Sequence, residues 1–600
     1  MTPDERSGSS PARRIPAALR RARRVAARRP EPSGPPQGSA ALLGPAGARC
    51  VVLADPAHPE RTQQWLRESR ADRVLVLTAD AAGWTPTSDS ASDSASDSIR
   101  VREARGIDEL VREVQKFGRI DVILSLLPKR KLPAGVPDQY DLFSRLFLYL
   151  RSGGTYIVDR TVEGGARSAL GANRWRQLLA VADNPRPDKR EASFAEAVGT
   201  LVVSRNMVLV TKRGRHLLKL RGTDVDEVLP LREPGTAVTM LASRPAGSFE
   251  SLAVETSYGP RVGEPLHQRV DYPAMSLRHY EGNIGSAGGM RLFTQDTILP
   301  DAFRWYFASG GGSPRLDSVT SDIARIPPRL LPKRRLAGDY YNLDCLYDGH
   351  FGHLTTEVVS RLWGWDEAKR ENPDLKALFH VRPKRNNNPV LERALFTAYG
   401  IREEDLVWVQ GPVKVRGLIS ATPMWQDQSP YFAHPEIPEI WQRLSAGLLG
   451  DAEPAEHERI FVSRGEKLSH RRRCRNQAEV ERFFADRGFH VFYPEQLSLT
   501  EQVALFAGAR VVAGFSGSAM FNLMHTRRLE ATIVLGQNAY LARNEQLFST
   551  VLGGELHYFW SPADVPPPEI GKRTLASVRS SWAFDFAEQG ADLERVIAAH

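Results

Sequence analysis

Cysteine is scarce in this chain of 600 residues, in which only Cys50, Cys345 and Cys474 occur. They are odd in number and far apart, which argues against a disulfide framework and against a cysteine-based zinc site. Long apolar runs are also missing. A bilayer span needs roughly 20 apolar residues, and the best candidate, Leu142–Leu150, is much shorter. We therefore expect a reducing, cytoplasmic setting.

Positive charge is concentrated in one short segment. The formal net charge of +9 invites a nucleic-acid function. Residues 1–30 contain nine arginines against Asp4 and Glu5, a local charge of +7, so the rest of the chain is nearly neutral. No apolar segment follows the arginines, which argues against a secretory signal. We expect a disordered basic arm over residues 1–45 and no nucleic-acid partner. The arm either contacts an anionic membrane peripherally or is a solvated tail without a partner.

The length and composition predict a globular protein of several domains. Domains usually contain roughly 100–200 residues, which gives three or four of them here. The chain is 42% hydrophobic and 25% charged, which excludes a wholly disordered chain and a multi-span membrane protein.

Strands alternate with helices after residue 46. Apolar runs rich in β-branched residues begin at Cys50, Arg73 and Ile120, and helical segments separate them. This alternation favours a parallel α/β sheet. An acidic Ser/Asp repeat over residues 88–98 predicts a surface loop.

The next segment predicts a helix and another strand. Gln139–Leu150 is amphipathic, Gly153 and Gly154 are expected to end the helix, and Thr155–Val158 is typical of a strand.

Residues 119–159 resemble the second half of a class I methyltransferase, in which a strand with Asp-Val-Ile precedes a helix and a strand that begins with Gly-Gly. The cofactor half differs from that family. The first strand is followed by Ala54-Asp-Pro-Ala-His-Pro59 instead of a glycine-rich turn, so the backbone cannot approach a cofactor closely. We expect a degenerate scaffold or adaptor here, with a working methyltransferase as the alternative.

A first polar cluster lies within Asp348–Trp363. His353, Glu357 and Arg361 are spaced four residues apart and share one face of an α-helix, and Glu357 and Arg361 have the spacing of an ion pair. His350 lies one turn earlier. The pattern indicates either an active-site face with a base or a capped helix with a surface ion pair. A metal site has less support, because no zinc-protease pattern is present.

A dense group of arginines follows a predicted buried strand. The strand ends at Ser463-Arg464, and a helix is expected to start near Asn476, with Asn476 as N-cap and Glu479 as its capping-box partner. The five arginines are Arg464, Arg471, Arg472, Arg473 and Arg475. This charge beside a helix start suits a diphosphate, and the alternative is a solvated basic loop.

A glycine-serine turn forms the third cluster. A helix with Glu501-Gln502 is followed by a strand, by Ser516-Gly517-Ser518 and by a second helix that contains Asn522. Gly517 permits a tight turn, and we expect the amides and hydroxyls of Ser516 and Ser518 to point at an anion.

Taken together, these motifs resemble the family 61 glycosyltransferases, which include bacterial capsular polysaccharide proteins and eukaryotic xylosyl- and N-acetylglucosaminyl-transferases. The resemblance covers about residues 280–560 and is strongest over 346–365 and 459–536. One position departs from the family, because many members have His-Gly-Ala where this chain has Ser516-Gly517-Ser518.

The resemblance implies an α/β fold of the GT-B type, with two Rossmann-like halves that follow the additional Rossmann-like domain. The expected boundaries are a Rossmann-like domain over 46–165, a linker and helix over 166–200, an acceptor-side half over 201–435, a nucleotide-sugar-binding half over 436–570 and C-terminal helices over 571–600.

The implied activity is inverting transfer of a sugar from a nucleotide-sugar to a glycan acceptor, in cell-surface or capsular polysaccharide biosynthesis and without a metal cofactor. His353 is the expected base, with Glu357 orienting or replacing it, and His350 and Arg361 are expected on the acceptor side. The expected donor-binding residues are Arg464, Arg473, Asn476, Glu501, Ser516, Gly517, Ser518 and Asn522. The alternatives are a SAM-dependent methyltransferase and a non-catalytic sugar-nucleotide-binding scaffold.

A cosedimentation experiment with anionic vesicles distinguishes the two interpretations of the basic arm. If the arm holds the protein at an anionic membrane, deletion of residues 1–45 lowers the fraction bound to anionic vesicles, since each basic residue near such a surface contributes about 1 kcal/mol. Unchanged partitioning identifies a tail without this role.

Overall fold

The computed structural model describes most of the chain and divides it into two compact units. The described residues are 47–69, 71–82, 84, 98–163, 175, 178, 189–204, 206–260, 268–303, 313, 315–381, 389–465, 472–540, 542–569 and 574–600. Unit 1 consists of residues up to 236 with segments 293–300 and 308–328, and unit 2 consists of residues 237–292, 301–307 and 329–600. The expected basic arm and residues 88–97 of the acidic repeat lie outside the described residues.

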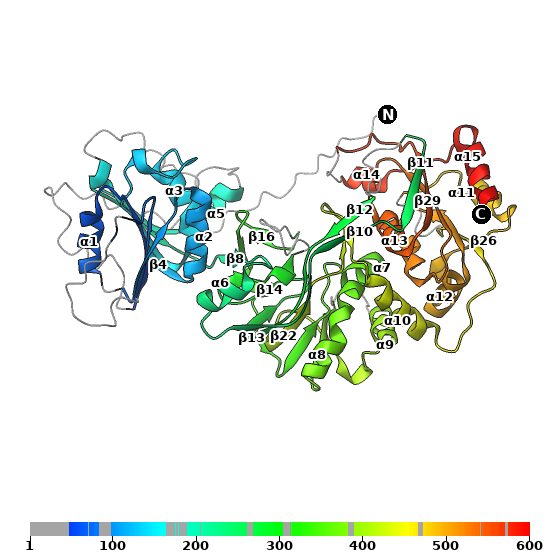
Figure 1. Ribbon diagram of the computed structural model, residues 1–600, viewed down its shortest axis with the longest axis horizontal. Helices are drawn as coiled ribbons and strands as arrows, with labels where there is room; N and C mark the ends of the chain where they lie inside the picture. Colours follow the sequence, from blue (N-terminus) through cyan, green and yellow to red (C-terminus); the bar gives the residue numbers. More distant parts are fainter. Residues whose placement is uncertain are drawn as a thin grey trace, which may run out of the picture. The chain divides into compact units, whose positions relative to one another are not determined.

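Unit 1 is built on a seven-stranded sheet in the order β3-β2-β1-β4-β5-β7-β6 (Figure 1). Its strands are β1 (Arg49–Ala54), β2 (Arg73–Thr78), β3 (Ile99–Glu103), β4 (Ile120–Ser125), β5 (Leu150–Asp159), β6 (Val198–Val203) and β7 (Met207–Lys212). The pairings of β7 with β5 and with β6 are antiparallel, and the other pairings in this sheet are parallel. The order 3-2-1-4-5 is that of a doubly wound sheet, so the predicted parallel α/β sheet is confirmed.

Helices cover both faces of this sheet. α1 (Pro59–Glu68) lies on one face, and α2 (Ile107–Phe117) and α3 (Gln139–Leu146) lie on the other (Figure 1). α3 is shorter than predicted, because β5 already begins at Leu150. Gly153 and Gly154 therefore lie inside β5 and do not end the helix. A Cβ at Gly154 would approach the carbonyl oxygen of Asp121 to 2.8 Å, so close packing on β4 requires glycine here.

Residues 198–212 belong to unit 1, although the sequence analysis divided them between the linker and the acceptor-side half. β6 and β7 form an antiparallel hairpin, and β7 pairs along β5, with Tyr156 opposite Val210. The hairpin covers the edge that β5 would otherwise expose, since an unpaired strand edge readily recruits another strand.

Unit 2 contains two large sheets and two small two-stranded ones, β10 (Gly247–Glu250) with β12 (Arg269–Tyr272) and β23 (Trp425–Gln426) with β24 (Phe432–Ala433). The first large sheet pairs its strands in the order β9-β13-β22-β19-β20-β21, antiparallel as far as β22 and parallel beyond it. Its strands are β9 (Ala237–Arg244), β13 (Met275–Ser286), β22 (Val413–Ala421), β19 (Asp339–Asn342), β20 (Lys376–His380) and β21 (Leu406–Val409).

The second sheet of unit 2 is entirely parallel, in the order β11-β29-β28-β27-β25-β26. Its strands are β11 (Ala253–Tyr258), β29 (Gly554–Ser561), β28 (Ala531–Gln537), β27 (Val511–Phe515), β25 (Arg459–Val462) and β26 (His490–Phe492). The helices predicted near residues 476 and 499 are present as α11 (Gln477–Ala485) and α12 (Leu499–Gly508).

One apolar core joins the two sheets of unit 2. At its centre Phe548 of α13 (Asn544–Leu552) lies with its ring centroid 4.6 Å from that of Trp425 and 5.0 Å from that of Trp441. Trp441 belongs to α10 (Ile437–Leu449). Phe521 follows the glycine-serine turn and also packs on Phe548, with ring centroids 5.5 Å apart. The core therefore lies directly beneath the turn that the sequence analysis identified.

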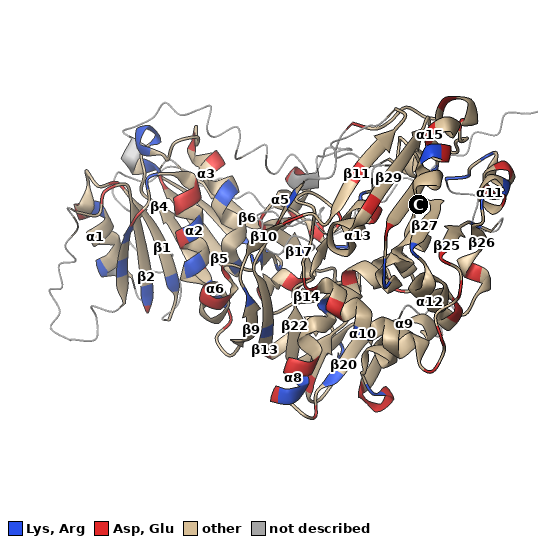
Figure 2. Cartoon of the chain, turned by 45° about the vertical axis from the view of Figure 1, so that its right-hand side comes forward, with Lys and Arg blue, Asp and Glu red and all other residues tan. Residues whose placement is uncertain are grey.

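Charge and hydropathy of the described chain agree with the sequence analysis. Basic and acidic residues are interspersed over the ribbons of both units in the view of Figure 2. Among the described helices, none has both the length and the apolar composition needed to cross a bilayer.

At Gly447, α10 lies so close to α9 (Val390–Tyr399) that there is no room for a side chain. A Cβ at this position would lie 1.9 Å from the carbonyl oxygen of Ala398, which is backbone and cannot move aside cheaply. We expect Gly447→Ala to lower the free energy of unfolding by about 1–3 kcal/mol, measured by denaturant unfolding.

The matched control is Gly590→Ala in the interior of α15 (Phe586–Ala599). There the nearest atoms to an added Cβ are 3.7 Å away. We expect that variant to be neutral or to gain up to about 1 kcal/mol from helix propensity. Equal effects of the two substitutions would contradict the packing argument.

Candidate active site in unit 2

The helical segment from Phe351 to Glu371 carries the first predicted cluster. It begins as α7 (Phe351–His353), continues through a π-helical turn, η9 (Leu354–Val358), and a 3₁₀ stretch, η10 (Val359–Gly364), and ends as α8 (Trp365–Glu371). π-helical turns are rare and frequently occur at functional sites. This one rotates the residues after His353 away from the ideal α-helical face.

His353 and Glu357 form a close pair. Nδ1 of His353 lies 2.7 Å from Oε1 of Glu357, and both side chains are largely buried. Because a carboxylate accepts a proton and does not donate one, the contact places the proton of a neutral imidazole on Nδ1. The other ring nitrogen, Nε2, then keeps a lone pair with which it can accept a proton.

His350 and Tyr347 surround the His353 ring. His350 is the N-cap of α7, and its Nδ1 accepts a hydrogen bond from the His353 amide at 3.4 Å. The His350 and Tyr347 ring centroids lie 4.8 Å and 4.6 Å from that of His353. These contacts limit rotation of the imidazole.

Arg361 is part of the core of unit 2. Its Nη1 donates to the carbonyl oxygen of Asp344 at 2.8 Å, and its Nη2 lies 3.5 Å from Sδ of Met290. Among the described residues no ion pair joins it to Glu357, so the predicted pair is not formed. The π-helical turn is the reason, because the spacing of four residues no longer places the two side chains on one face.

The arginine at the end of β25 lies against the glycine-serine turn. Nη2 of Arg464 donates to the carbonyl oxygen of Ser516. Burial, followed by the charge of Arg472, lowers the pKa of Arg464 to about 10. The guanidinium is therefore a desolvated cation at neutral pH, which strengthens any interaction with an anion.

Gly517 is required where the two guanidiniums meet. It has φ +146°, and a Cβ there would lie 2.2 Å from Nη2 of Arg464 and 3.1 Å from Nη2 of Arg472. Arg472 also lies over the ring of Tyr540, with its guanidinium carbon 4.1 Å from the centroid. The turn thus places two cations side by side at the start of η14 (Ser518–His525).

An internal carboxylate occupies two of the groups that were expected to face an anion. Oε1 of Glu545 accepts hydrogen bonds from the Gly517 amide at 2.6 Å and from Ser516 Oγ at 3.0 Å. The Tyr558 hydroxyl in turn donates to Ser516 Oγ at 2.9 Å. Ser516 therefore braces the turn from inside the protein, and its hydroxyl does not face outward as expected.

Glu545 is almost completely buried, with 1% of its surface exposed. Burial raises its pKa above the ordinary value of 4.5, although the hydrogen bonds from Ser516 and Gly517 and the charge of Arg472 oppose the shift. Its Oε2 has no hydrogen-bond partner within the described part of the chain. The sequence analysis did not identify Glu545, because its contacts with the turn span 28 and 29 residues of sequence.

The histidine cluster and the turn meet at Gly352. A Cβ on Gly352 would lie 3.1 Å from Cβ of Ser518, 3.0 Å from the Phe521 ring and 3.4 Å from the His350 ring. The helix that carries His353 therefore packs directly on the turn that carries the cations. The segment with the expected base and the turn with the expected anion-binding residues are therefore neighbours in unit 2.

The other predicted donor-binding residues have structural contacts. Asn476 is the N-cap of α11 as predicted, but its side chain forms no cap hydrogen bond. Instead its amide group bonds both backbone groups of Phe584, at 2.9 Å and 3.0 Å. Glu501 forms a capping box with Ser498 at the start of α12.

Asn522 and Arg473 lie differently with respect to the turn. Asn522 is buried and donates to the carbonyl oxygen of Ala519 at 3.1 Å and to Oε1 of Gln502 at 3.2 Å, which braces the turn on α12. The side chain of Arg473 is exposed, whereas that of Arg472 reaches the turn. Arg471 lies outside the described residues.

The carboxyl ends of β1 and β4 in unit 1 enclose only a small cavity of about 40 Å³. It is lined by Asp55, His58, Arg61, Leu126, Pro128 and Arg130. Rossmann-type sheets bind their ligands at this edge.

Residues 351–533 match the family model Glycosyltransferase 61. The match confirms the resemblance derived from the motifs and indicates glycosyltransferase activity at the level of the family. It contains the His353 helix, Arg464 and the glycine-serine turn. No curated protein matches this chain.

Methyltransferases are among the solved structures that resemble this chain, and the resemblance is weak and lies in the N-terminal region. MycE methyltransferase from the mycinamycin pathway is 15% identical with a TM-score of 0.21, covering 30% of this chain and 44% of that one. An rRNA methylase from Streptococcus thermophilus is 16% identical with a TM-score of 0.20, covering 31% and 100%. This chain therefore matches less than half the length of the MycE structures.

The buried Glu545 carboxyl predicts a pH-dependent stability. A carboxyl group whose pKa is raised on folding binds more protons when folded, so its contribution to the free energy of unfolding falls as pH rises from about 4.5 through the folded pKa. Glu545→Gln retains the acceptor for Gly517 and Ser516 but does not titrate. We expect the variant to gain stability relative to the wild type as pH rises through this window.

Denaturant unfolding at a series of pH values measures this difference. Glu588→Gln, at an exposed position in the first turn of α15, is the control. A difference between Glu545→Gln and wild type that stays constant with pH would contradict the assignment.

Proposed function

We propose that unit 2 is an inverting glycosyltransferase that moves a sugar from a nucleotide-sugar to a glycan acceptor. The observation that carries the proposal is the contact at Gly352, which joins a carboxylate-oriented histidine to a turn that two guanidiniums approach. Inverting transfer needs a base for the acceptor hydroxyl and cations for the departing diphosphate. The family match over residues 351–533 supports the same activity.

Arg464 and Arg472 are the proposed diphosphate-binding residues. Charge-assisted hydrogen bonds from guanidinium groups to phosphate are roughly twice as strong as neutral ones. In a desolvated site they stabilise the negative charge that develops on the leaving diphosphate. Arg472 takes the role expected of Arg473, because its side chain is the one that reaches Gly517. In this proposal the two cations stabilise the leaving diphosphate in place of a divalent metal ion.

His353 is the proposed base. Its Nε2 accepts the proton of the acceptor hydroxyl while the acceptor oxygen attacks the anomeric carbon. The bond from that carbon to the diphosphate oxygen breaks, and its electron pair leaves with the diphosphate. Attack from the face opposite the leaving group inverts the configuration. Glu357 holds the proton on Nδ1 and stabilises the imidazolium that forms, as a carboxylate does in hydrolytic triads.

Ser516 replaces the histidine that many family members have at this turn. Its hydroxyl is engaged by Glu545 and Tyr558, so in this proposal it supports Gly517 from below and does not contact the donor. Catalysis then depends on His353 as the imidazole base.

The wider setting is proposed from the resemblance. The two sheets of unit 2 correspond to the halves of a GT-B enzyme, and the product is a cell-surface or capsular polysaccharide. A cytoplasmic location suits a nucleotide-sugar donor, and the basic arm gives peripheral contact with the inner face of the membrane.

Turnover of a panel of nucleotide-sugars tests the proposal. We expect His353→Ala to lower kcat by about 10²–10⁴-fold, the range for loss of a general base. Arg464→Ala and Arg472→Ala should each lower kcat/KM by about 10²–10³-fold, as removal of a transition-state donor does. Arg473→Ala should cost less than Arg472→Ala, because its side chain is exposed.

Arg475→Ala is the control for charge in the same loop, since Arg475 is exposed and pairs with Asp564. Full activity of both His353→Ala and Arg464→Ala would show that the site is wrongly assigned. Binding of S-adenosylmethionine without any nucleotide-sugar would favour a methyltransferase, and binding of nucleotide-sugar without turnover would favour a scaffold.

A further inference from the structure

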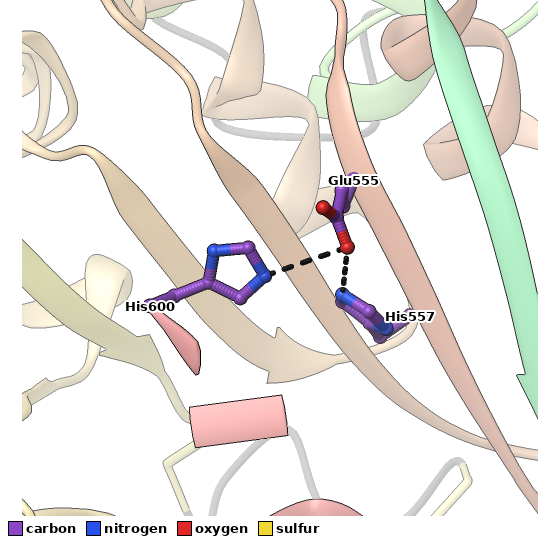
Figure 3. Close-up of side chains that lie close together, drawn as sticks. All are labelled: Glu555, His557 and His600. Carbon is purple, nitrogen blue, oxygen red and sulfur yellow. Dashed lines mark ion pairs between the residues drawn. The ribbon is translucent and has the colours of Figure 1, made fainter. Parts of the chain in front are cut away.

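Three side chains with metal-binding atoms lie close together in unit 2 (Figure 3). Glu555 and His557 lie on β29, and His600 follows α15. Nε2 of His557 lies 3.2 Å from Oε2 of Glu555, and Nε2 of His600 lies 3.6 Å from the same oxygen. All three donor atoms lie within 4.8 Å of one another.

These separations suit a tetrahedral ion. Zinc binds imidazole nitrogen and carboxylate oxygen at about 2.0–2.2 Å, which places neighbouring donors of a tetrahedral site about 3.3–3.6 Å apart. The Glu555 oxygen already lies close to these distances from both nitrogens, and the exposed side of Glu555 leaves the fourth position to water.

The Nε2 atoms of the two imidazoles have no hydrogen-bond partner besides the Glu555 carboxylate among the described residues. Within the described part of the chain, Nε2 of His557 and Nε2 of His600 are buried and make no hydrogen bond of good geometry. His557 is 94% buried, because only 6% of its surface is exposed. Two buried ring nitrogens that face one carboxylate oxygen are costly without a ligand, since unsatisfied buried polar groups destabilise a protein.

Tyr258 supports His557 from the other side. Its hydroxyl lies 3.3 Å from Nδ1 of His557, and its ring stacks on Phe559 with centroids 4.3 Å apart. Metal-bound histidines almost always place their second nitrogen against such an oxygen, which fixes the ring and the tautomer. Nε2 of His557 is then the nitrogen that faces Glu555 and His600.

The strand separates this cluster from the glycosyltransferase site. Side chains alternate between the faces of a strand, so His557 and Tyr558 point in opposite directions. Tyr558 reaches Ser516, and His557 therefore faces away from the glycine-serine turn.

We propose that Glu555, His557 and His600 bind one divalent transition-metal ion, with zinc as the first candidate, and that the ion ties the end of α15 to β29. Imidazole donors favour zinc, copper or nickel over magnesium and calcium, which take oxygen ligands. The ion stabilises unit 2 and takes no part in sugar transfer.

The test uses the full chain without a histidine tag, freed of metal with EDTA and titrated with zinc chloride against a chromophoric chelator. We expect one zinc ion per chain and a rise in Tm on zinc addition. Glu555→Gln and His600→Ala should weaken zinc binding by more than the roughly 10–100-fold that even outer-shell partners contribute, and should abolish the rise in Tm.

His457→Ala, which removes an exposed histidine elsewhere in unit 2, is the matched control and should bind zinc as the wild type does. Glu555 is exposed, so Glu555→Gln is expected to fold and keeps the test decisive if His600→Ala does not fold. A wild type without stoichiometric zinc, or equal affinities of wild type, Glu555→Gln and His600→Ala, would overturn the proposal.

Discussion

The site in unit 2 depends on a balance of buried charge around Gly517. Two guanidiniums, from Arg464 and Arg472, approach the turn from one side, and the carboxyl group of Glu545 holds it from the other. Burial and the charge of Arg472 lower the pKa of Arg464 to about 10, although the charges of Glu545 and Glu495 raise it. In the proposed reaction a diphosphate would bring its negative charge to these two guanidiniums, where charge-assisted hydrogen bonds are strong.

The core supplies the rigidity that this balance requires. Phe521 directly follows the turn and packs on Phe548, and Phe548 lies on the same helix as Glu545. The helix with His353 packs on the turn through Gly352, where a side chain would collide with Ser518 and Phe521. Substitutions at these glycines are therefore expected to disturb the chemistry and the packing together.

Local patterns predicted much of this architecture. The strand β25 just before Ser463-Arg464, the start of α11 after Asn476 and the strand-turn-helix around Gly517 all follow from apolar periodicity and from helix or turn signals in neighbouring residues. The pairing of His353 with Glu357 followed from their spacing. Each of these features is decided within about one helical turn or one strand of sequence.

The features that the sequence did not reveal depend on contacts between distant residues. The π-helical turn redirected Arg361 into the core, and Glu545 reached the turn from another helix. The choice between Arg472 and Arg473 depends on which side chain faces Gly517, which charge composition does not encode. The residue pattern of β6 and β7 would fit strands of either unit. Only the pairing of β7 with β5 assigns the hairpin to unit 1.

A crystal structure of the protein with a bound nucleotide-sugar tests the central claim most directly. The account predicts that the diphosphate contacts the guanidiniums of Arg464 and Arg472 beside Ser518, with the anomeric carbon on the side of His353. A nucleotide bound away from both arginines, or one whose sugar lies out of reach of His353, would contradict it.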